Sequence, residues 1–162
     1  MERPSSKKLI FVRHAHRDKT EGREKDNGLS RKGWKQAERV KRYFVSQIGK
    51  TKPRLLSSRK LRCMETLAPL ADKLEASVDI SPLLMEEEPG LAPLKTRVKK
   101  FCDEWKNSKE PLVVACSHGD WLPIALEHLT GACIELKKGG WAEMEQDGER
   151  IVLRNVLQEL PD

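Results

Sequence analysis

The sequence of 162 residues is poor in aromatic side chains and contains no long hydrophobic run. Aromatic residues make up only 5% of it, and no apolar stretch approaches the roughly 20 residues that a membrane-spanning helix needs. The apolar run Leu9–Val12 is also too short to be the hydrophobic region of a secretory signal peptide. We therefore expect a cytoplasmic protein without a membrane partner.

Cysteine residues are few and lie far apart. Their spacing contains no C-x-x-C pair, so it is unlike that of a zinc site and gives no sign of a disulfide framework. We expect free thiols in a reducing compartment. The four residues are Cys63, Cys102, Cys116 and Cys133.

Charged residues are abundant, and their balance is basic. Lys and Arg total 31 and Asp and Glu total 25, which gives a formal net charge of +6. This balance favours anionic partners such as phosphate esters or nucleic acids. Because acidic residues interrupt the basic ones, most of the charge is expected on ordinary solvated surface. The sequence has no DNA- or RNA-reading motif, so we expect no specific nucleic-acid partner.

Short apolar runs predict strands along the whole chain. Near the C-terminus, runs at 141–145 and 150–156 flank Asp147-Gly148, a dipeptide typical of a tight turn, and predict a hairpin. Four further strands are predicted by runs of apolar and β-branched residues, at Leu9–Val12, Arg54–Ser58, Ala76–Ile80 and Leu112–Cys116.

Between these strands, apolar side chains recur at spacings of three and four residues, as on one face of a helix. Ser30 is suited to cap the first helix, which is predicted to end near Gly49. Pro69 predicts a kink or an early end in the second helix, because proline lacks the amide donor. The other helices are predicted at 61–74, 91–105 and 121–129. The core face of the first is predicted to contain Trp34, Ala37, Val40, Phe44 and Ile48.

Strands that alternate with helices predict an α/β fold with a mostly parallel central sheet. We expect helices on both faces of this sheet, which makes a three-layer sandwich, with the C-terminal hairpin at the sheet. The length is typical of one domain and short for a catalytic domain that carries an additional cap. No linker interrupts the pattern, so residues 1–162 are predicted to form a single domain without a cap.

Three polar clusters each follow a predicted strand. They are RHAHR at Arg13–Arg17, SSRKLR at Ser57–Arg62 and SHGD at Ser117–Asp120. Ligands of parallel sheets bind beyond the carboxyl ends of the strands, so we expect the clusters to meet there. The crowded cations of the first cluster repel one another, which favours a bound anion. Arg13 and His14 can share a pocket only if the strand ends there, because successive residues of a strand face opposite sides.

Four segments, in order, resemble the signatures of the histidine phosphatase superfamily, which has the phosphoglycerate-mutase-like fold. Ala15 replaces the more common glycine of this signature. This alanine and the small size of the chain make the sequence most similar to the small phosphohistidine phosphatases. The resemblance implies a metal-independent hydrolase without a cofactor, which hydrolyses phosphohistidine or a small phosphomonoester through a phosphohistidine intermediate. The segments are Arg13–Ala15, Leu29–Ala37, Ser57–Thr66 and Ser117–Gly119.

The resemblance also implies roles for individual residues. His14 matches the nucleophile, and His118 matches the second histidine of the pocket. Arg13 and Arg62 match the two phosphate-binding arginines, whose planar guanidinium groups can hold phosphate oxygens without a metal. Nearby cations should lower the pKa of His14 and keep it neutral.

The general acid is implied to come from the segment Leu84–Glu86. Chemistry alone does not distinguish Glu86 from Glu87 and Glu88, and we select Glu86. His16 and Arg17 are expected to border the pocket, and His128 is expected to have no role.

Two loops are predicted to determine the substrate, the charged segment Arg17–Gly28 and the turn Pro82–Leu91. The expected partner is a phosphorylated small molecule or a phosphohistidine protein. The alternative hypothesis is a non-enzymatic module of the same fold that binds phosphate without turnover.

Overall fold

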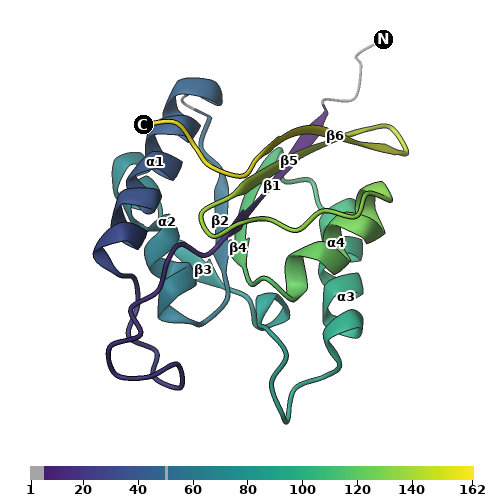
Figure 1. Ribbon diagram of the computed structural model, residues 1–162. Helices are drawn as coiled ribbons and strands as arrows, with labels where there is room; N and C mark the ends of the chain where they lie inside the picture. The colour runs from purple at the N-terminus through teal and green to yellow at the C-terminus, as the bar shows by residue number, and fades with distance from the viewer. Residues whose placement is uncertain (1–5, 50) are drawn as a thin grey trace.

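Strands and helices alternate along most of the chain (Figure 1). The computed structural model describes residues 6–49 and 51–162. The strands are β1 (Lys7–Arg13), β2 (Arg54–Ser57), β3 (Val78–Ile80), β4 (Leu112–Ser117), β5 (Trp141–Asp147) and β6 (Arg150–Leu157). The helices are α1 (Arg31–Gln47), α2 (Leu61–Leu74), α3 (Leu94–Asn107) and α4 (Trp121–Thr130), with a short 3-10 helix, η1 (Pro82–Leu84).

The strands form one mixed sheet in the order β3-β2-β4-β1-β5-β6. The pairs β2 with β3, β2 with β4, and β1 with β4 are parallel. Strand β5 pairs antiparallel with β1 and forms the predicted hairpin with β6. The predicted α/β class and mostly parallel sheet are therefore confirmed.

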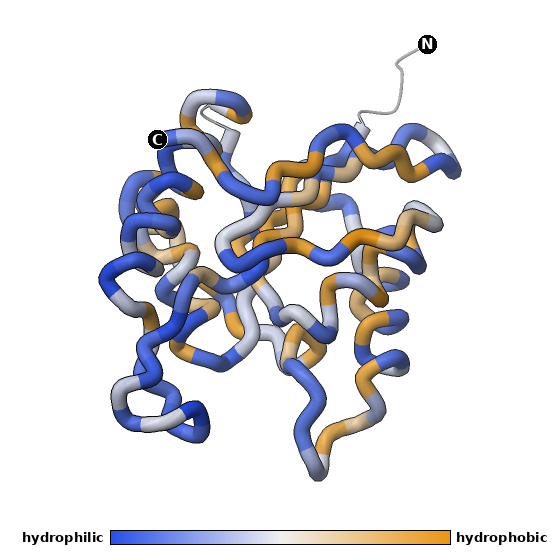
Figure 2. Tube along the Cα trace, in the orientation of Figure 1, coloured by the Kyte–Doolittle hydropathy of each residue, from blue (hydrophilic) through white to orange (hydrophobic). Residues whose placement is uncertain are grey.

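Helices cover both faces of the sheet, α1 and α2 on one side and α3 and α4 on the other (Figure 1). Alternate residues of β1 enter the two cores, as the period of a strand requires. Leu9 and Phe11 pack with residues of α3 and α4, whereas Ile10 and Val12 pack with residues of α1 and α2. Figure 2 shows hydrophobic residues along the central strands and hydrophilic ones along the loop between β1 and α1.

The core face of α1 differs from the prediction at its first turn. Ala37, Val40 and Phe44 are buried as expected, but the side chain of Trp34 is 39% exposed. Gly33 takes its place in the buried stripe, because a Cβ atom there would lie 2.0 Å from the carbonyl oxygen of His16. The close approach of the helix to the backbone after β1 leaves no room for a side chain at this position.

Two further differences from the predicted helices occur at proline residues. Helix α2 does not end early at Pro69 but continues to Leu74. Pro69 lies half-buried while Leu67 and Leu70 beside it are buried, so core packing outweighs the single hydrogen bond that is lost. Helix α3 begins at Leu94 and not at Leu91, because Pro93 occupies its N-cap position with a non-helical ψ of 143°.

Two findings concern the predictions about membranes and thiols. Within the part of the chain that the structure describes, no helix is both long and apolar enough to cross a membrane. The four cysteines are free, three of them buried and Cys133 exposed.

Candidate active site

The three polar clusters meet at one edge of the sheet. Strand β4 lies between β1 and β2, and all three are parallel, so the segments that leave their carboxyl ends are neighbours. A pocket of about 550 Å³ opens there. It brings together all five predicted site residues, Arg13, His14, Arg62, Glu86 and His118.

Strand β1 ends where the site begins. Arg13 is its last residue, paired in register with Ser117 of β4. Beyond it, the His14 amide donates to the Ser117 carbonyl at 3.1 Å, and the Gly139 amide donates to the Arg13 carbonyl at 3.1 Å. Because the strand has ended, the Arg13 and His14 side chains both line the pocket, as the sequence required.

The imidazole of His14 is fixed in one tautomer. Its Nδ1 lies 2.9 Å from the carbonyl oxygen of Ala15, which can only accept, so Nδ1 carries the hydrogen and Nε2 keeps its lone pair. The Ala15 amide in turn donates to Thr66 Oγ1 at 2.9 Å. His14 is only 6% exposed, so this arrangement holds a neutral, nucleophilic nitrogen at the end of β1.

The pKa of His14 is lowered to about 3, mainly because the side chain is buried, and the charges of His118, Arg62 and Arg13 act in the same direction while the hydrogen bond to Ala15 opposes the shift. His14 is therefore neutral at physiological pH. The prediction that nearby cations depress this pKa holds, but desolvation by the protein is the larger cause.

The buried His14 predicts a stability that depends on pH. Between its ordinary pKa of 6.5 and its folded pKa of about 3, the unfolded chain binds a proton that the folded protein does not. The free energy of unfolding therefore falls as the pH drops through this window, by up to about 1.4 kcal/mol per pH unit from this group. Above the ordinary pKa this contribution is constant.

The variant His14→Gln cannot titrate at this position and serves as the reference. Urea denaturation near pH 7.5 and near pH 4.5 should show that wild type loses about 2.7 kcal/mol more than the variant on acidification. The comparison cancels the other titrating groups, which both proteins share. Equal losses in the two proteins would contradict the buried, neutral state of His14.

Arg62 is the most deeply held cation of the pocket. It is the second residue of α2, is 4% exposed, and donates from Nη2 to both carboxylate oxygens of Glu86 at 2.8 and 2.9 Å. The same nitrogen lies 3.3 Å from His118 Nδ1. Its Nε is buried and has no hydrogen-bond partner within the described residues.

His118 directly follows the last residue of β4, and its imidazole lies near that of His14. It is 1% exposed, and the two imidazole centroids lie 5.5 Å apart. Its Nε2 forms a hydrogen bond of 2.8 Å with Ser58 Oγ, while Nδ1 lies 3.4 Å from Glu86 Oε2. Ser58 therefore fixes the orientation of the ring, a role that sequence reasoning missed although Ser58 stands in the second polar cluster.

Geometry distinguishes the three consecutive glutamates. Glu86 lines the pocket, whereas Glu88 pairs with Arg59 at 2.7 Å and Glu87 accepts from the Leu94 amide at 3.3 Å. The segment is fixed from the other side by Arg97, whose guanidinium donates to the carbonyl oxygens of Met85 and Glu86.

The pKa of Glu86 is lowered overall. Burial raises it, but the charges of His118 and Arg62 and the hydrogen bond from Arg62 outweigh that effect.

Arg13 is packed against glycine. Its Nη1 donates to the Leu136 carbonyl at 2.7 Å, and a Cβ atom at position 119 would lie 2.7 Å from its Nη2. Only glycine at position 119 lets the guanidinium reach this place. Its Nε, like that of Arg62, has no partner among residues 6–49 and 51–162.

A family comparison covers more than half of the chain. The family model of the histidine phosphatase superfamily (branch 1) matches residues 9–93. The chain belongs to the histidine phosphatase superfamily. The matched region contains His14, Arg62 and Glu86, and His118 lies beyond it.

Solved structures share the fold of this histidine phosphatase superfamily member. Mycobacterial hydrolase 1 is 16% identical with a TM-score of 0.77, over 96% of this chain and 100% of that one. Phosphoserine phosphatase from Entamoeba histolytica, in complex with 3-phosphoglyceric acid, is 17% identical with a TM-score of 0.71, over 93% and 96%. A mycobacterial glucosyl-3-phosphoglycerate phosphatase with bound VO3 is 18% identical with a TM-score of 0.70, over 92% and 98%. No curated protein matches the sequence.

From the sequence, Arg17 and His16 are expected to border the pocket of this histidine phosphatase superfamily member, and His128 is expected to have no role in it. Arg17 lines it, as expected. The Nδ1 of His16 is bound to Ser30 Oγ at 2.7 Å, and His16 does not line this pocket but an adjoining one that shares Arg13. His128 lies on α4, 4.0 Å from Asp103, and is outside the site. In the described part of the chain, no group of three His, Cys, Asp or Glu side chains could hold a metal ion.

Proposed function

We propose that this histidine phosphatase superfamily member hydrolyses a phosphorylated small molecule through a phosphohistidine intermediate on His14. The observation that carries the proposal is the fixed tautomer of His14, whose free Nε2 lone pair lies in a pocket with two arginines. A neutral imidazole nitrogen is a nucleophile, and the covalent intermediate divides one difficult hydrolysis into two easier transfers.

In the first transfer, Nε2 of His14 forms a bond to phosphorus while the bond from phosphorus to the leaving group breaks. Negative charge spreads over the three equatorial oxygens. Arg13 and Arg62, which line the pocket beside His14, supply guanidinium donors for these oxygens. His118, held by Ser58, is placed to donate a further hydrogen bond.

Glu86 is proposed as the general acid. In the structure its carboxylate is paired with Arg62, which keeps its pKa low. A phosphate dianion that binds Arg62 replaces this partner and adds a negative charge nearby, and both changes raise the pKa of Glu86. Protonated Glu86 then gives its proton to the leaving-group oxygen.

In the second transfer, a water oxygen bonds to phosphorus and the phosphorus–nitrogen bond breaks, which returns the electron pair to His14 Nε2. The water proton passes to Glu86, which is now a carboxylate. Phosphate leaves, Glu86 pairs with Arg62 again and releases its proton to solvent, and His14 is again a neutral imidazole with a free Nε2.

The proposal also concerns the leaving group, which is either an imidazole or an alkoxide. Phosphohistidine and small phosphomonoesters both fit the chemistry of His14. An imidazole leaving group needs less protonation than an alkoxide, so a phosphohistidine substrate would depend less on Glu86. The related solved structures are named for phosphomonoester substrates, which favours the monoester. We place the reaction in the cytoplasm, in a single domain without a cap over the pocket.

Trapping of the intermediate tests the proposal. Wild-type protein incubated with a radiolabelled phosphate donor and quenched in alkali should carry label that acid releases, as expected of phosphohistidine. A panel of a phosphohistidine peptide, sugar phosphates and nucleotides then identifies the leaving group by turnover. Tight binding of phosphate without label or turnover would instead establish a non-enzymatic phosphate-binding module.

A further inference from the structure

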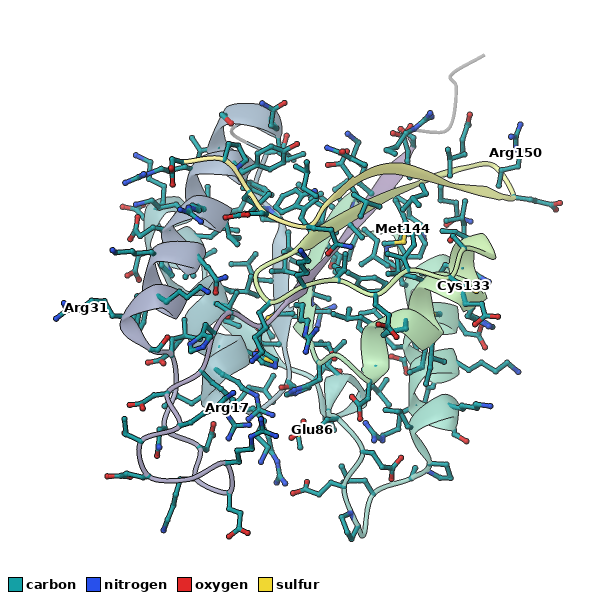
Figure 3. All side chains as sticks on the ribbon, in the orientation of Figure 1. Arg17, Arg31, Glu86, Cys133, Met144 and Arg150 are labelled. Atoms are coloured by element: carbon teal, nitrogen blue, oxygen red, sulfur yellow. The ribbon has the colours of Figure 1, made fainter. Side chains whose placement is uncertain are left out.

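One side of the pocket is lined by cations that the proposed reaction does not use. Arg17, Lys19 and Arg23 come from the loop between β1 and α1, and Lys138 comes from the segment before β5. We call these four side chains the basic wall. Figure 3 shows Arg17 on the side of the loop between β1 and α1 and Glu86 on the side of the loop that follows η1.

The basic wall is not paired with carboxylates of the described chain, although the nearby charges of Glu86 and Asp26 act to raise the pKa of Arg17 against the effect of its burial. Across residues 6–49 and 51–162, none of its members forms a salt bridge with a carboxylate. Its members are also close to one another. Burial lowers the pKa of Lys138, and the charges of Lys19, Arg13 and Arg23 lower it further. Like charges that crowd in this way repel one another, and a bound anion would relieve the repulsion.

The loop that carries three of these cations is anchored. Arg17 pairs with Leu29 in an antiparallel bridge, and its guanidinium donates to the carbonyl of Arg23. Both carboxylate oxygens of Asp26 accept from the Leu61 amide, at 3.0 and 2.9 Å. The loop is thus tied to the first residue of α2, the helix that carries the buried arginine of the site. These contacts hold the part of the basic wall that the loop contributes at the pocket.

The charge of the pocket exceeds what one phosphate group neutralises. Six Arg and Lys side chains line it against three carboxylates, those of Glu86, Asp120 and Glu135, which leaves three positive charges in excess. Glu86 is already paired with Arg62, and Asp120 accepts from the Glu87 amide at 2.9 Å. A phosphate monoester brings about two negative charges at neutral pH. About one positive charge remains uncompensated.

We infer that the substrate is a small phosphate ester with a second anionic group on its leaving group, which the basic wall binds. This inference rests on the proposed function and extends it to the substrate class. The pocket volume of about 550 Å³ is in the range typical of small-molecule sites. The scissile phosphate lies against His14 and Arg62, and the second anion lies against Lys19, Arg23 and Lys138.

Glucose 1,6-bisphosphate and glucose 6-phosphate are a matched pair of probes, because they differ in one anionic group. We expect wild type to show a kcat/KM at least about tenfold higher for the bisphosphate, which corresponds to about 1.4 kcal/mol. In Lys19→Ala/Lys138→Ala this ratio should fall toward one. The ratio in wild type should also fall between about 50 and 500 mM salt, because salt screens exposed charges.

The double variant Lys99→Ala/Lys100→Ala is the control, because it removes the same charge from exposed positions on α3. It should keep the ratio of wild type. A ratio near one in wild type, or a ratio that survives loss of Lys19 and Lys138, would overturn the inference while hydrolysis of glucose 6-phosphate still supported the proposed function.

A binding measurement separates this inference from the proposed reaction. Calorimetric titration of His14→Ala with both probes reports recognition without turnover, and circular dichroism confirms that the variant is folded. Tighter binding of the bisphosphate supports the basic wall even if wild type proves inactive, in which case only the proposed reaction fails. Equal binding of the two probes overturns the basic wall.

Discussion

Replacing His14 with alanine is expected to abolish phosphate release from p-nitrophenyl phosphate. The variant loses the imidazole whose free Nε2 we propose as the nucleophile, so the covalent route closes. We expect kcat to fall by at least about three orders of magnitude, the scale seen when an enzyme loses its nucleophile. Release of inorganic phosphate under saturating substrate is the measurement, and the trapped label on the protein should disappear with it.

The control for this prediction is His128→Ala. His128 is a histidine in the last turn of α4, outside the pocket, so its loss should leave kcat within about twofold of wild type, as expected for a surface substitution. Phosphate release by His14→Ala at the rate of wild type would refute the assignment of the nucleophile.

Replacing Arg62 with alanine is expected to have the second largest effect. The guanidinium is 4% exposed and holds Glu86 through one nitrogen while another faces no partner within the described chain. Its removal takes away a donor to the phosphoryl oxygens and also frees Glu86, whose negative charge then repels the phosphate. We expect kcat/KM to fall by about 10² to 10³, as for loss of one donor to a developing charge.

Two further variants separate charge from geometry at this position. Arg62→Lys keeps the positive charge but loses the planar fork, so its activity should lie between those of wild type and Arg62→Ala. Arg59→Ala removes an exposed arginine that pairs with Glu88, and it should change kcat/KM by less than about threefold because exposed ion pairs contribute little. Similar losses in Arg59→Ala and Arg62→Ala would show that general charge, and not the buried fork, matters.

Much of the framework of the site could be predicted from the sequence because its signals are local. Leu9–Val12 and Leu112–Cys116 are apolar runs that belong to fully buried strands, and both are found in the structure. Polar residues directly after such strands meet at the carboxyl edge whenever the strands are parallel neighbours. This rule placed Arg13, His14 and His118 together without any knowledge of side-chain contacts.

Other features have no local signal. The core stripe of α1 begins at Gly33, which has no side chain for a hydrophobic pattern to detect, so the pattern selects Trp34 instead. The approach of Lys138 to Lys19 joins residues distant in sequence. From the sequence alone, both lysines are predicted to be ordinary surface charges. Only the path of the loop between β1 and α1 brings them to the same pocket.

The origin of the site from separate strands has a consequence for folding. Strand β1 pairs with β4 across about a hundred residues of intervening chain, as in the pair Lys8 and Leu112, and contacts of such long range form slowly. Helices can form before this pairing, but His14, Arg62 and His118 cannot meet until it is complete. Recovery of activity after dilution from denaturant should therefore lag behind recovery of the helical signal, because catalysis requires the pairing of β1 with β4.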